Sequence, residues 1–394
     1  MAVRTIAAWG VLTLAFVLSP TAGLRAQTGP APLLETPALQ AIVVDGETGA
    51  VLFEKSADEP FPPASLAKLM TLELVFRGLE GGLITPTTAY PVSENAWRTG
   101  GAPSRTSTMF AEVRSSVPVE ALARGVAIQQ ANDACIILAE GMEGTEGAFV
   151  QAMNERAAEL GLATSRFANS TGLPAEGQQT SARDMARLGR HLQRTYPEWY
   201  GLFAEPEFTW NGIRQRNRNP LLGLNIGATG VATGFAEGAG YAILGAAEGD
   251  GRTTFVALGG LESEQVRSRE TARILAWAKD SFDLRSLFPQ GATVGRALVY
   301  GGTLPDVALR TGEEIAAMIP RAAPQSVSAA IVYDGPLRAP VAAGDKVGRL
   351  EVRIAGSPSV VRDLFAAEDV PEGTFTARAF GAVQELAFGW IRAL

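Results

Sequence analysis

Strand-like segments on both sides of a long helical stretch constrain the fold of this chain more than any other feature. Residues 41–53 place short apolar runs around the turn Asp45–Gly49, which is the pattern of a β-hairpin. A second pair of strands is indicated at residues 241–258, whereas residues 63–191 are spaced mostly like helices. One sheet built from distant segments, with helices packed on it, fits this order better than a βαβ repeat.

Apolar residues recur with helical spacing in several segments of this first part of the chain. The clearest are Leu66–Leu79, Val119–Glu140, Ala148–Leu160 and Ser263–Phe282. We therefore expect an α+β domain over residues 27–284, with helices packed on an antiparallel sheet.

The pattern changes after Pro289, where short β-like runs alternate with glycine- and proline-containing turns. Examples are Arg296–Tyr300, Ser328–Tyr333 and Lys346–Ile354. We assign residues 285–374 to a small all-β domain.

The first residues have the three-part pattern of an export signal. Arg4 gives a positive start, residues 5–18 form an apolar run, and small residues follow. The run is too short for a comfortable transmembrane helix. We expect residues 1–26 to be removed as a signal peptide. Cleavage after Gly23 is the alternative site, and an uncleaved anchor is the alternative role.

Residues 375–394 have the apolar spacing of an amphipathic helix. The apolar face carries Phe380, Val383, Ala387, Trp390, Ile391 and Leu394. Such a helix either packs on the β domain or lies in a membrane surface as an anchor. We favour the anchor, because the helix is terminal, bears aromatic residues and follows an export signal.

The chain has one histidine and one cysteine, which narrows its possible chemistry. Cys135 alone forms no internal disulfide or cysteine cluster, and a site with several histidines is excluded. We expect Cys135 to be a buried, inert thiol and His191 to be structural. A net charge of −7 without a basic run argues against nucleic acid as a partner. We expect no metal and no cofactor.

The segment Pro62–Met70 carries chemistry that needs no histidine. Its prolines suit the start of a helix, which would place Ser65 and Lys68 one turn apart on the same face. A lysine amine there takes the proton of the serine hydroxyl if burial lowers its pKa. Backbone N–H groups at the start of the helix would lie near the attacked carbonyl. The alternative is a solvated lysine on an ordinary amphipathic helix, since Ser-x-x-Lys alone is a weak motif.

The order of several further segments resembles the low-molecular-weight penicillin-binding proteins, which are serine-type D-alanyl-D-alanine carboxypeptidases of the DacA kind. The segments that carry the resemblance are 62–71, 93–101, 132–135, 149–154, 160–162, 167–174, 217–222, 233–241 and 339–352. The resemblance covers nearly the whole mature chain. It implies a penicillin-binding transpeptidase/β-lactamase-like domain followed by the small β domain, and it implies catalytic roles for Ser65 and Lys68.

The second motif of that family reads Ser-x-Asn, and the corresponding residues here are Gln130, Ala131 and Asn132. The resemblance implies a catalytic role for Asn132 and a place in the substrate site for Gln130. The missing serine hydroxyl would relay protons towards the leaving group. A glutamine amide donates and accepts hydrogen bonds but does not shuttle a proton in that way.

The third motif of the family reads Lys-Thr-Gly, and here it reads Ala232, Thr233 and Gly234. The resemblance implies that these residues and Phe235 line the substrate site, with the N–H groups of Phe235 and Ser65 forming an oxyanion hole. The lysine that would face the terminal carboxylate of the substrate is replaced. Losing one such contact costs about 3–4 kcal/mol of transition-state stabilisation. Arginines that would restore the charge are Arg214, Arg216 and Arg218.

Two hypotheses of different class follow from these observations. In the first, Ser65 attacks the D-Ala-D-Ala end of a peptidoglycan pentapeptide during cell-wall remodelling, and β-lactams acylate the same serine. In the second, a pseudoenzyme keeps the fold to bind peptidoglycan or a partner. A β-lactamase is less favoured, because it would need an acid such as Glu176 or Asp184 to activate the deacylating water. The expected location is periplasmic, peripheral on the inner membrane through the C-terminal helix.

Overall fold

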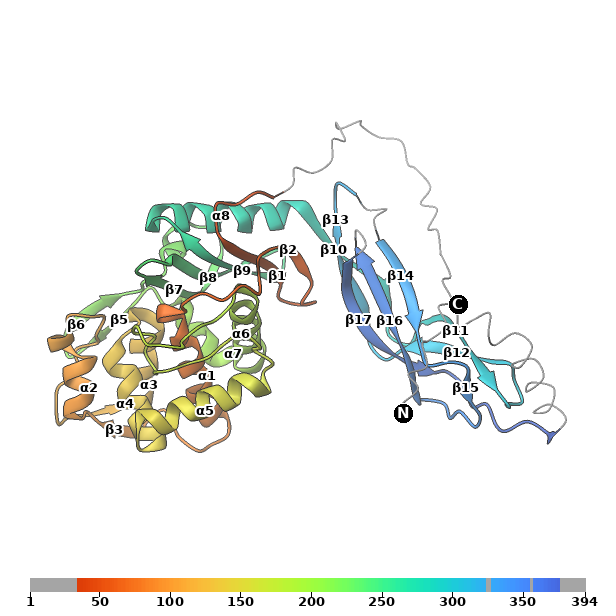
Figure 1. The fold of residues 1–394 in the computed structure, drawn as a ribbon, viewed down its shortest axis with the longest axis horizontal. Coiled ribbons are helices and arrows are strands. Elements are labelled where there is room, and N and C mark those ends of the chain that lie inside the picture. Colours follow the sequence, from red (N-terminus) through yellow and green to blue (C-terminus); the bar gives the residue numbers. More distant parts are fainter. Residues whose placement is uncertain (1–33, 324–326, 355–356, 376–394) are drawn as a thin grey trace. The chain divides into compact units, whose positions relative to one another are not determined.

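The computed structural model describes residues 34–323, 327–354 and 357–375, and two compact units divide between residues 280 and 281 (Figure 1). The expected signal peptide lies outside the described residues, as does the expected C-terminal helix from residue 376 onward. Within the described part of the chain, no helix is long and apolar enough to cross a membrane.

The first unit contains the predicted helices and strands together with five further strands, β3 to β7. Its helices are α1 Lys68–Glu80, α2 Glu94–Thr99, α3 Val119–Arg124, α4 Asn132–Glu143, α5 Glu146–Glu159, α6 Ala182–Thr195, α7 Pro197–Tyr200 and α8 Glu264–Ser281. Its strands are β1 Gln40–Asp45, β2 Val51–Lys55, β3 Ala89–Pro91, β4 Ser116–Pro118, β5 Glu207–Trp210, β6 Ile213–Arg216, β7 Ala228–Ala236, β8 Gly240–Gly249 and β9 Arg252–Leu261.

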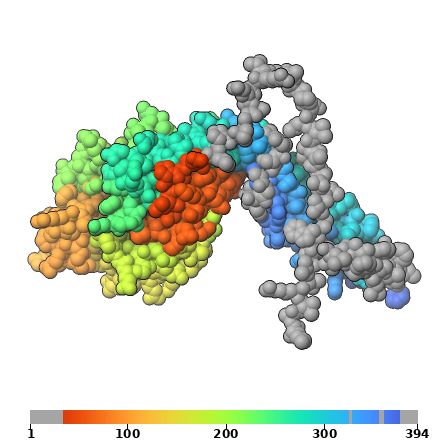
Figure 2. All heavy atoms as spheres, turned by 45° about the horizontal axis from the view of Figure 1, so that its top comes forward, coloured from red at the N-terminus to blue at the C-terminus, as the bar shows by residue number. Residues whose placement is uncertain are grey.

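The central sheet of this unit joins segments that are far apart in the sequence. It has five antiparallel strands in the order β2-β1-β9-β8-β7, and β1 pairs with β9 so that Ile42 lies opposite Ala257. Figure 2 shows the N-terminal hairpin, coloured red, beside the green segment that follows residue 240. The prediction of one sheet built from distant segments is confirmed.

Helices cover both faces of the central sheet (Figure 1). On one face, Ile274 of α8 packs in a cluster with Val256 of β9. On the other face, Phe255 of β9 belongs to a larger cluster with Met70 of α1 and Leu188 of α6. Adjacent residues of β9 point to opposite faces, so both are buried and the strand is apolar throughout. This packing leaves β7 at the sheet edge, beside the turn that carries Ser65.

The second unit is an all-β domain, as predicted. Its strands are β10 Phe282–Phe288, β11 Thr293–Tyr300, β12 Asp306–Thr311, β13 Ile315–Pro320, β14 Val327–Val332, β15 Leu337–Arg338, β16 Lys346–Ile354 and β17 Ser357–Ala366. They form a sheet in the order β14-β16-β17-β12-β11-β15 and a pair β10-β13 around their own apolar core.

The predicted single helix over Val119–Glu140 is wrong. Helix α3 ends at Arg124, a π-helical turn follows over Gly125–Gln129, and Gln130 adopts a φ of 55° before α4 begins. Apolar spacing continues through this region because both helices bury their sides in the same core. The break turns Gln130 away from the helix and towards the sheet edge.

Candidate active site

Ser65 and Lys68 come together at the start of α1, as their spacing predicts. Ser65 lies in a 3-10 turn, Ala64–Ala67, rather than in the first turn of the α-helix. The Lys68 amine donates a hydrogen bond to Ser65 Oγ over 3.0 Å and another to the carbonyl of Thr171. Ser65 is half-buried and Lys68 is buried, so the hydroxyl is accessible while the amine is shielded from water.

Burial changes the acidity of this lysine. Loss of hydration disfavours the charged amine and lowers the pKa of Lys68 from 10.5 to about 8. A lysine with an ordinary pKa is almost entirely protonated at neutral pH and accepts no proton. The burial therefore supplies the condition that lets Lys68 act as a base towards Ser65.

Two close backbone approaches hold the turn around Ser65. A Cβ on Gly172 would lie 1.7 Å from the carbonyl oxygen of Ala64, and the φ of Gly172 is +77°. On the other side, a Cβ on Gly234 of β7 would lie 2.9 Å from the carbonyl oxygen of Pro63. Only glycine fits at such distances, so both neighbours are packed directly on the turn.

Gln130 lies against β7 and not in solvent. Its side-chain amide donates to the carbonyl of Thr233 over 3.1 Å, and the Thr233 hydroxyl lies 3.5 Å from its amide oxygen. The side chains of both residues are buried. The structure thus brings the second and third sequence motifs into contact, through the residue that departs from the Ser-x-Asn pattern.

Asn132 begins α4 and is 3% exposed. Its amide donates to Thr106 Oγ1 over 2.8 Å, while its buried Oδ1 has no hydrogen-bond partner among the described residues. Next to it, the Asp133 carboxylate accepts from Thr108 Oγ1 and from the backbone N–H of Met109. The bonds to Asp133 fix the loop that presents Thr106. Asn132 Oδ1 is left as an acceptor that a ligand can satisfy.

Strand β7 presents the third motif. Ala232, Thr233 and Gly234 are buried in this edge strand, and the Phe235 ring is 55% exposed and contacts the Tyr241 ring at 4.6 Å between centroids. The Ala232 methyl supplies no charge. The motif therefore offers a hydroxyl and backbone groups, with an aromatic ring beside them.

A buried arginine that the sequence did not single out also reaches β7. Arg267 of α8 is 5% exposed and its Nη1 lies 3.4 Å from the carbonyl of Gly234. Its Nε is buried without a hydrogen-bond partner among the described residues, and its guanidinium lies 5.5 Å from the Tyr241 ring centroid. Glu264, its ion-pair partner at 4.0 Å, is largely exposed and neutralises it weakly.

Arg267 supplies the positive charge beside the third motif. Of the arginines expected to do so, Arg214 is exposed and pairs with Glu207 on the neighbouring strand. Arg216 and Arg218 are exposed as well. Arg267 gives no sequence signal for this role, because it is far from the motifs in the sequence and reaches β7 only through the packing of α8 on the sheet.

The other predicted residues behave as structural groups. Cys135 is fully buried, and burial raises the pKa of its thiol to about 12, which makes it inert as a nucleophile. His191 Nε2 lies 3.2 Å from the buried carboxylate of Glu73, far along α1 from Ser65. Within the described ranges, no three His, Cys, Asp or Glu side chains are grouped as a metal ion would require.

An antiparallel sheet covered by helices, with a half-buried serine bonded to a buried lysine beside its edge strand, defines a serine acyl-transfer fold of the penicillin-binding class. Residues 26–261 match the family described as D-alanyl-D-alanine carboxypeptidase, and residues 282–372 match the C-terminal domain of penicillin-binding protein 5. The chain belongs to the D-alanyl-D-alanine carboxypeptidase family.

Relatives of known name cover almost the whole chain. D-alanyl-D-alanine carboxypeptidase DacC of Escherichia coli is 37% identical over 95% of this chain and 94% of its own length. DacA of the same organism is 33% identical over 89% of this chain and 87% of its own length. The crystal structure of penicillin-binding protein 5 from Haemophilus influenzae is 31% identical, covers 87% of this chain and 100% of that one, and superposes with a TM-score of 0.77.

These comparisons confirm the predicted family and the carboxypeptidase function, and they give no support to the pseudoenzyme hypothesis. A further structure, penicillin-binding protein D2 of Listeria monocytogenes in its ampicillin-bound form, is 26% identical over 62% of this chain and 99% of that one, with a TM-score of 0.53.

Proposed function

We propose that the protein cleaves the terminal D-alanine from peptidoglycan stem peptides through an acyl-enzyme at Ser65. The observation that carries this proposal is the 3.0 Å hydrogen bond between Lys68 Nζ and Ser65 Oγ, combined with a lysine pKa of about 8. The family and its named carboxypeptidase relatives support the substrate class.

In the first half-reaction, Ser65 Oγ attacks the carbonyl carbon of the penultimate D-alanine while its proton passes to neutral Lys68. The oxyanion is held by backbone N–H groups of Ser65 and Phe235. The C–N bond then breaks, the leaving amine takes a proton from Lys68, and D-alanine departs. In the second half-reaction, water attacks the ester carbonyl and gives a proton to Lys68. The bond between the carbonyl carbon and Ser65 Oγ then breaks, Ser65 Oγ takes the proton back from Lys68, and the trimmed peptide leaves as an acid that ionises to a carboxylate.

The remaining residues of the site bind and orient the peptide in this proposal. Asn132 accepts a hydrogen bond from a backbone N–H of the substrate through its unpartnered Oδ1. The Thr233 hydroxyl and the Arg267 guanidinium receive the terminal carboxylate, which replaces the charge that a lysine at position 232 would provide. Gln130, Ala232 and Gly234 shape the wall of the substrate site.

The same chemistry extends to β-lactams, whose strained amide offers Ser65 a carbonyl and whose carboxylate would pair with Arg267. Export to the periplasm through residues 1–26, and attachment to the inner-membrane surface through residues 375–394, fit a protein that acts on the cell wall. The apolar spacing of those two segments supports this location.

A fluorescent penicillin tests the proposal. The purified protein is incubated with the probe beside Ser65→Ala, and labelling is located by mass spectrometry of peptides. We expect one covalent adduct on the peptide that contains residue 65, and none in the variant. Labelling that survives in Ser65→Ala, or no labelling at saturating probe and long incubation, would overturn the assignment of the nucleophile.

A further inference from the structure

The Lys68 amine has a second hydrogen-bond partner besides the Ser65 hydroxyl. It donates to the backbone carbonyl of Thr171, which lies in the segment 169–172 between α5 and α6. Lys68 and Thr171 are both buried, with 3% and 2% of their surface exposed. A neutral amine has two N–H donors and one lone pair, and the lone pair has to face Ser65 Oγ to take its proton. The Thr171 carbonyl occupies one N–H donor, which limits rotation of the amine about the Cε–Nζ bond.

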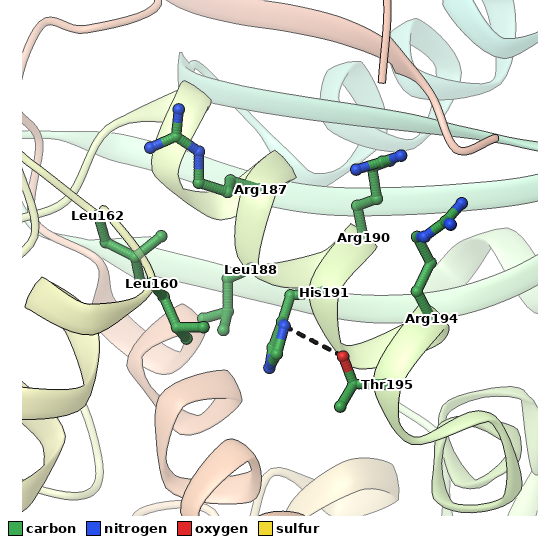
Figure 3. A pocket seen from close by; sticks show the side chains of 8 residues that line it. All are labelled: Leu160, Leu162, Arg187, Leu188, Arg190, His191, Arg194 and Thr195. Carbon is green, nitrogen blue, oxygen red and sulfur yellow. Dashed lines mark hydrogen bonds between the residues drawn. The ribbon is translucent and has the colours of Figure 1, made fainter. Parts of the chain in front are cut away.

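This second acceptor on the Lys68 amine is a neutral carbonyl, and the carboxylate on the same helix is engaged elsewhere. Glu73 Oε1 accepts from the Tyr196 hydroxyl over 3.1 Å and lies 3.2 Å from His191 Nε2. The other ring nitrogen of His191 lies 3.2 Å from Thr195 Oγ1 (Figure 3). A carboxylate on the Lys68 amine would favour its charged form, which accepts no proton. The carbonyl therefore orients the base without the full negative charge that would keep it protonated.

Asn169 fixes the direction of the Thr171 carbonyl. Its Oδ1 accepts from the backbone N–H of Gly172 over 2.7 Å and from Thr171 Oγ1 over 3.0 Å, and its Nδ2 donates to the carbonyl of Leu173 over 2.9 Å. The Thr171 carbonyl and the Gly172 N–H belong to one planar trans peptide group, in which they point in opposite directions. The bond that holds this N–H therefore aims the carbonyl to the other side, where the Lys68 amine accepts the constraint by donating to it.

Glu146 fixes the position of the same segment. It lies at the start of α5, and its Oε1 accepts from the backbone N–H of Ser170 over 3.0 Å and from the Ser170 hydroxyl over 2.6 Å. The carbonyl of Ser170 in turn accepts from Thr71 Oγ1 over 2.7 Å. Since Thr71 and Lys68 are three residues apart, they lie on one face of α1. The consecutive carbonyls of Ser170 and Thr171 thus both accept from that face, and a shift of the segment would move both acceptors.

We propose that Asn169 and Glu146 are positioning residues for proton transfer from the Ser65 hydroxyl. Through the Thr171 carbonyl they hold one N–H of the neutral Lys68 amine, so that its lone pair faces Ser65 Oγ. When the serine attacks, the O–H bond breaks, its electron pair goes into the new bond between Oγ and the carbonyl carbon, and the proton forms a third N–H bond on the amine. The inference rests on the proposed function and adds to it two residues that act through the backbone.

Single-turnover labelling by a fluorescent penicillin tests this inference, with the first-order rate constant at saturating probe as the readout. The test variants are Asn169→Ala and Glu146→Ala. Glu146→Gln is the conservative variant, because its amide oxygen still accepts from Ser170. Molecules that are unfolded lower the amplitude of labelling and leave this rate constant unchanged. Each alanine variant is a sufficient test of its own residue, and either one tests the inference if the other does not fold.

The matched control is Asn154→Ala, which removes an asparagine that holds the same stretch of chain at another point. Asn154 Oδ1 accepts from the backbone N–H of Phe167 over 2.9 Å, and its Nδ2 donates to the Phe167 carbonyl over 2.8 Å. This variant should unfold at a lower urea concentration, yet label at the rate of the unsubstituted protein. It separates general weakening of the segment from loss of the acceptor on Lys68.

We expect both alanine variants to label about tenfold more slowly, and Glu146→Gln to stay within about twofold of the unsubstituted protein. The loss should persist at pH 9.5, where most of the amine is neutral because the pKa of Lys68 is about 8. The probe concentration at half-saturation should not change.

Three results would overturn the positioning role. They are an unchanged rate constant in a folded alanine variant, a loss that disappears at pH 9.5, and an equal loss in Asn154→Ala. In each of them the unsubstituted protein still labels at Ser65, so the proposed function stands. No labelling of the unsubstituted protein would overturn the proposed function, and this inference with it.

Discussion

Acylation of Ser65 should rise with pH through a midpoint near 8, because only neutral Lys68 accepts the serine proton. The pKa of Lys68 falls from 10.5 to about 8 on burial. At pH 7 about one molecule in ten then carries the neutral amine, against about one in three thousand for an unperturbed lysine. Between pH 7 and pH 9 the neutral fraction, and with it the acylation rate, should increase about tenfold.

The assay is single-turnover labelling by a fluorescent penicillin, quenched at intervals between pH 6 and pH 9.5. Lys68→Arg should label at least a hundredfold more slowly and lose the midpoint, since arginine stays protonated. Lys279→Arg, at an exposed lysine on α8, should keep the profile. A rate that is flat or falls across pH 8 in the unsubstituted protein would refute the role of Lys68 as base.

Further predictions concern the neighbours of this pair. Gln130→Ser restores a hydroxyl beside β7 and should raise the acylation rate at least about tenfold, measured with the same probe. Arg267→Gln should lower kcat/KM for a D-Ala-D-Ala peptide about a hundredfold, with Arg267→Lys recovering part of the loss. Gly172→Ala would place a methyl 1.7 Å from a carbonyl oxygen and should destabilise the protein by more than about 2 kcal/mol in urea unfolding, with slower labelling. Lys68→Met should abolish labelling yet stabilise the protein by about 1–2 kcal/mol at pH 7. The pKa of Lys68 is lower in the folded protein than in the unfolded chain, so burying the charged amine lowers the free energy of unfolding. This destabilisation is largest below pH 8, where Lys68 is charged in both states, and it disappears as the pH rises to 10.5.

The sequence predicted the elements that form from interactions between neighbouring residues. The hairpin at residues 41–53 and the strands near 241–258 follow from alternating apolar residues around turn residues, and the structure pairs them in one sheet. The contact between Ser65 and Lys68 follows from a spacing of three residues, which holds in a 3-10 turn as well as in an α-helix.

Features that depend on packing were not predictable in the same way. The break at Gln130 interrupts a stretch whose apolar spacing is uniform, because the two helices share one core. Arg267 reaches β7 only because α8 crosses the sheet there, and its sequence neighbourhood is an ordinary polar helix face.

We predict that this protein turns over D-Ala-D-Ala peptides with Gln130 and Ala232 at the positions where the family resemblance implies a serine and a lysine. The direct measurement is enzyme-coupled detection of D-alanine released from a soluble pentapeptide, beside Ser65→Ala and a penicillin-treated sample. We predict continuous release by the unsubstituted protein and none in either control. Penicillin labelling at Ser65 without release of D-alanine from the peptide would contradict the claim.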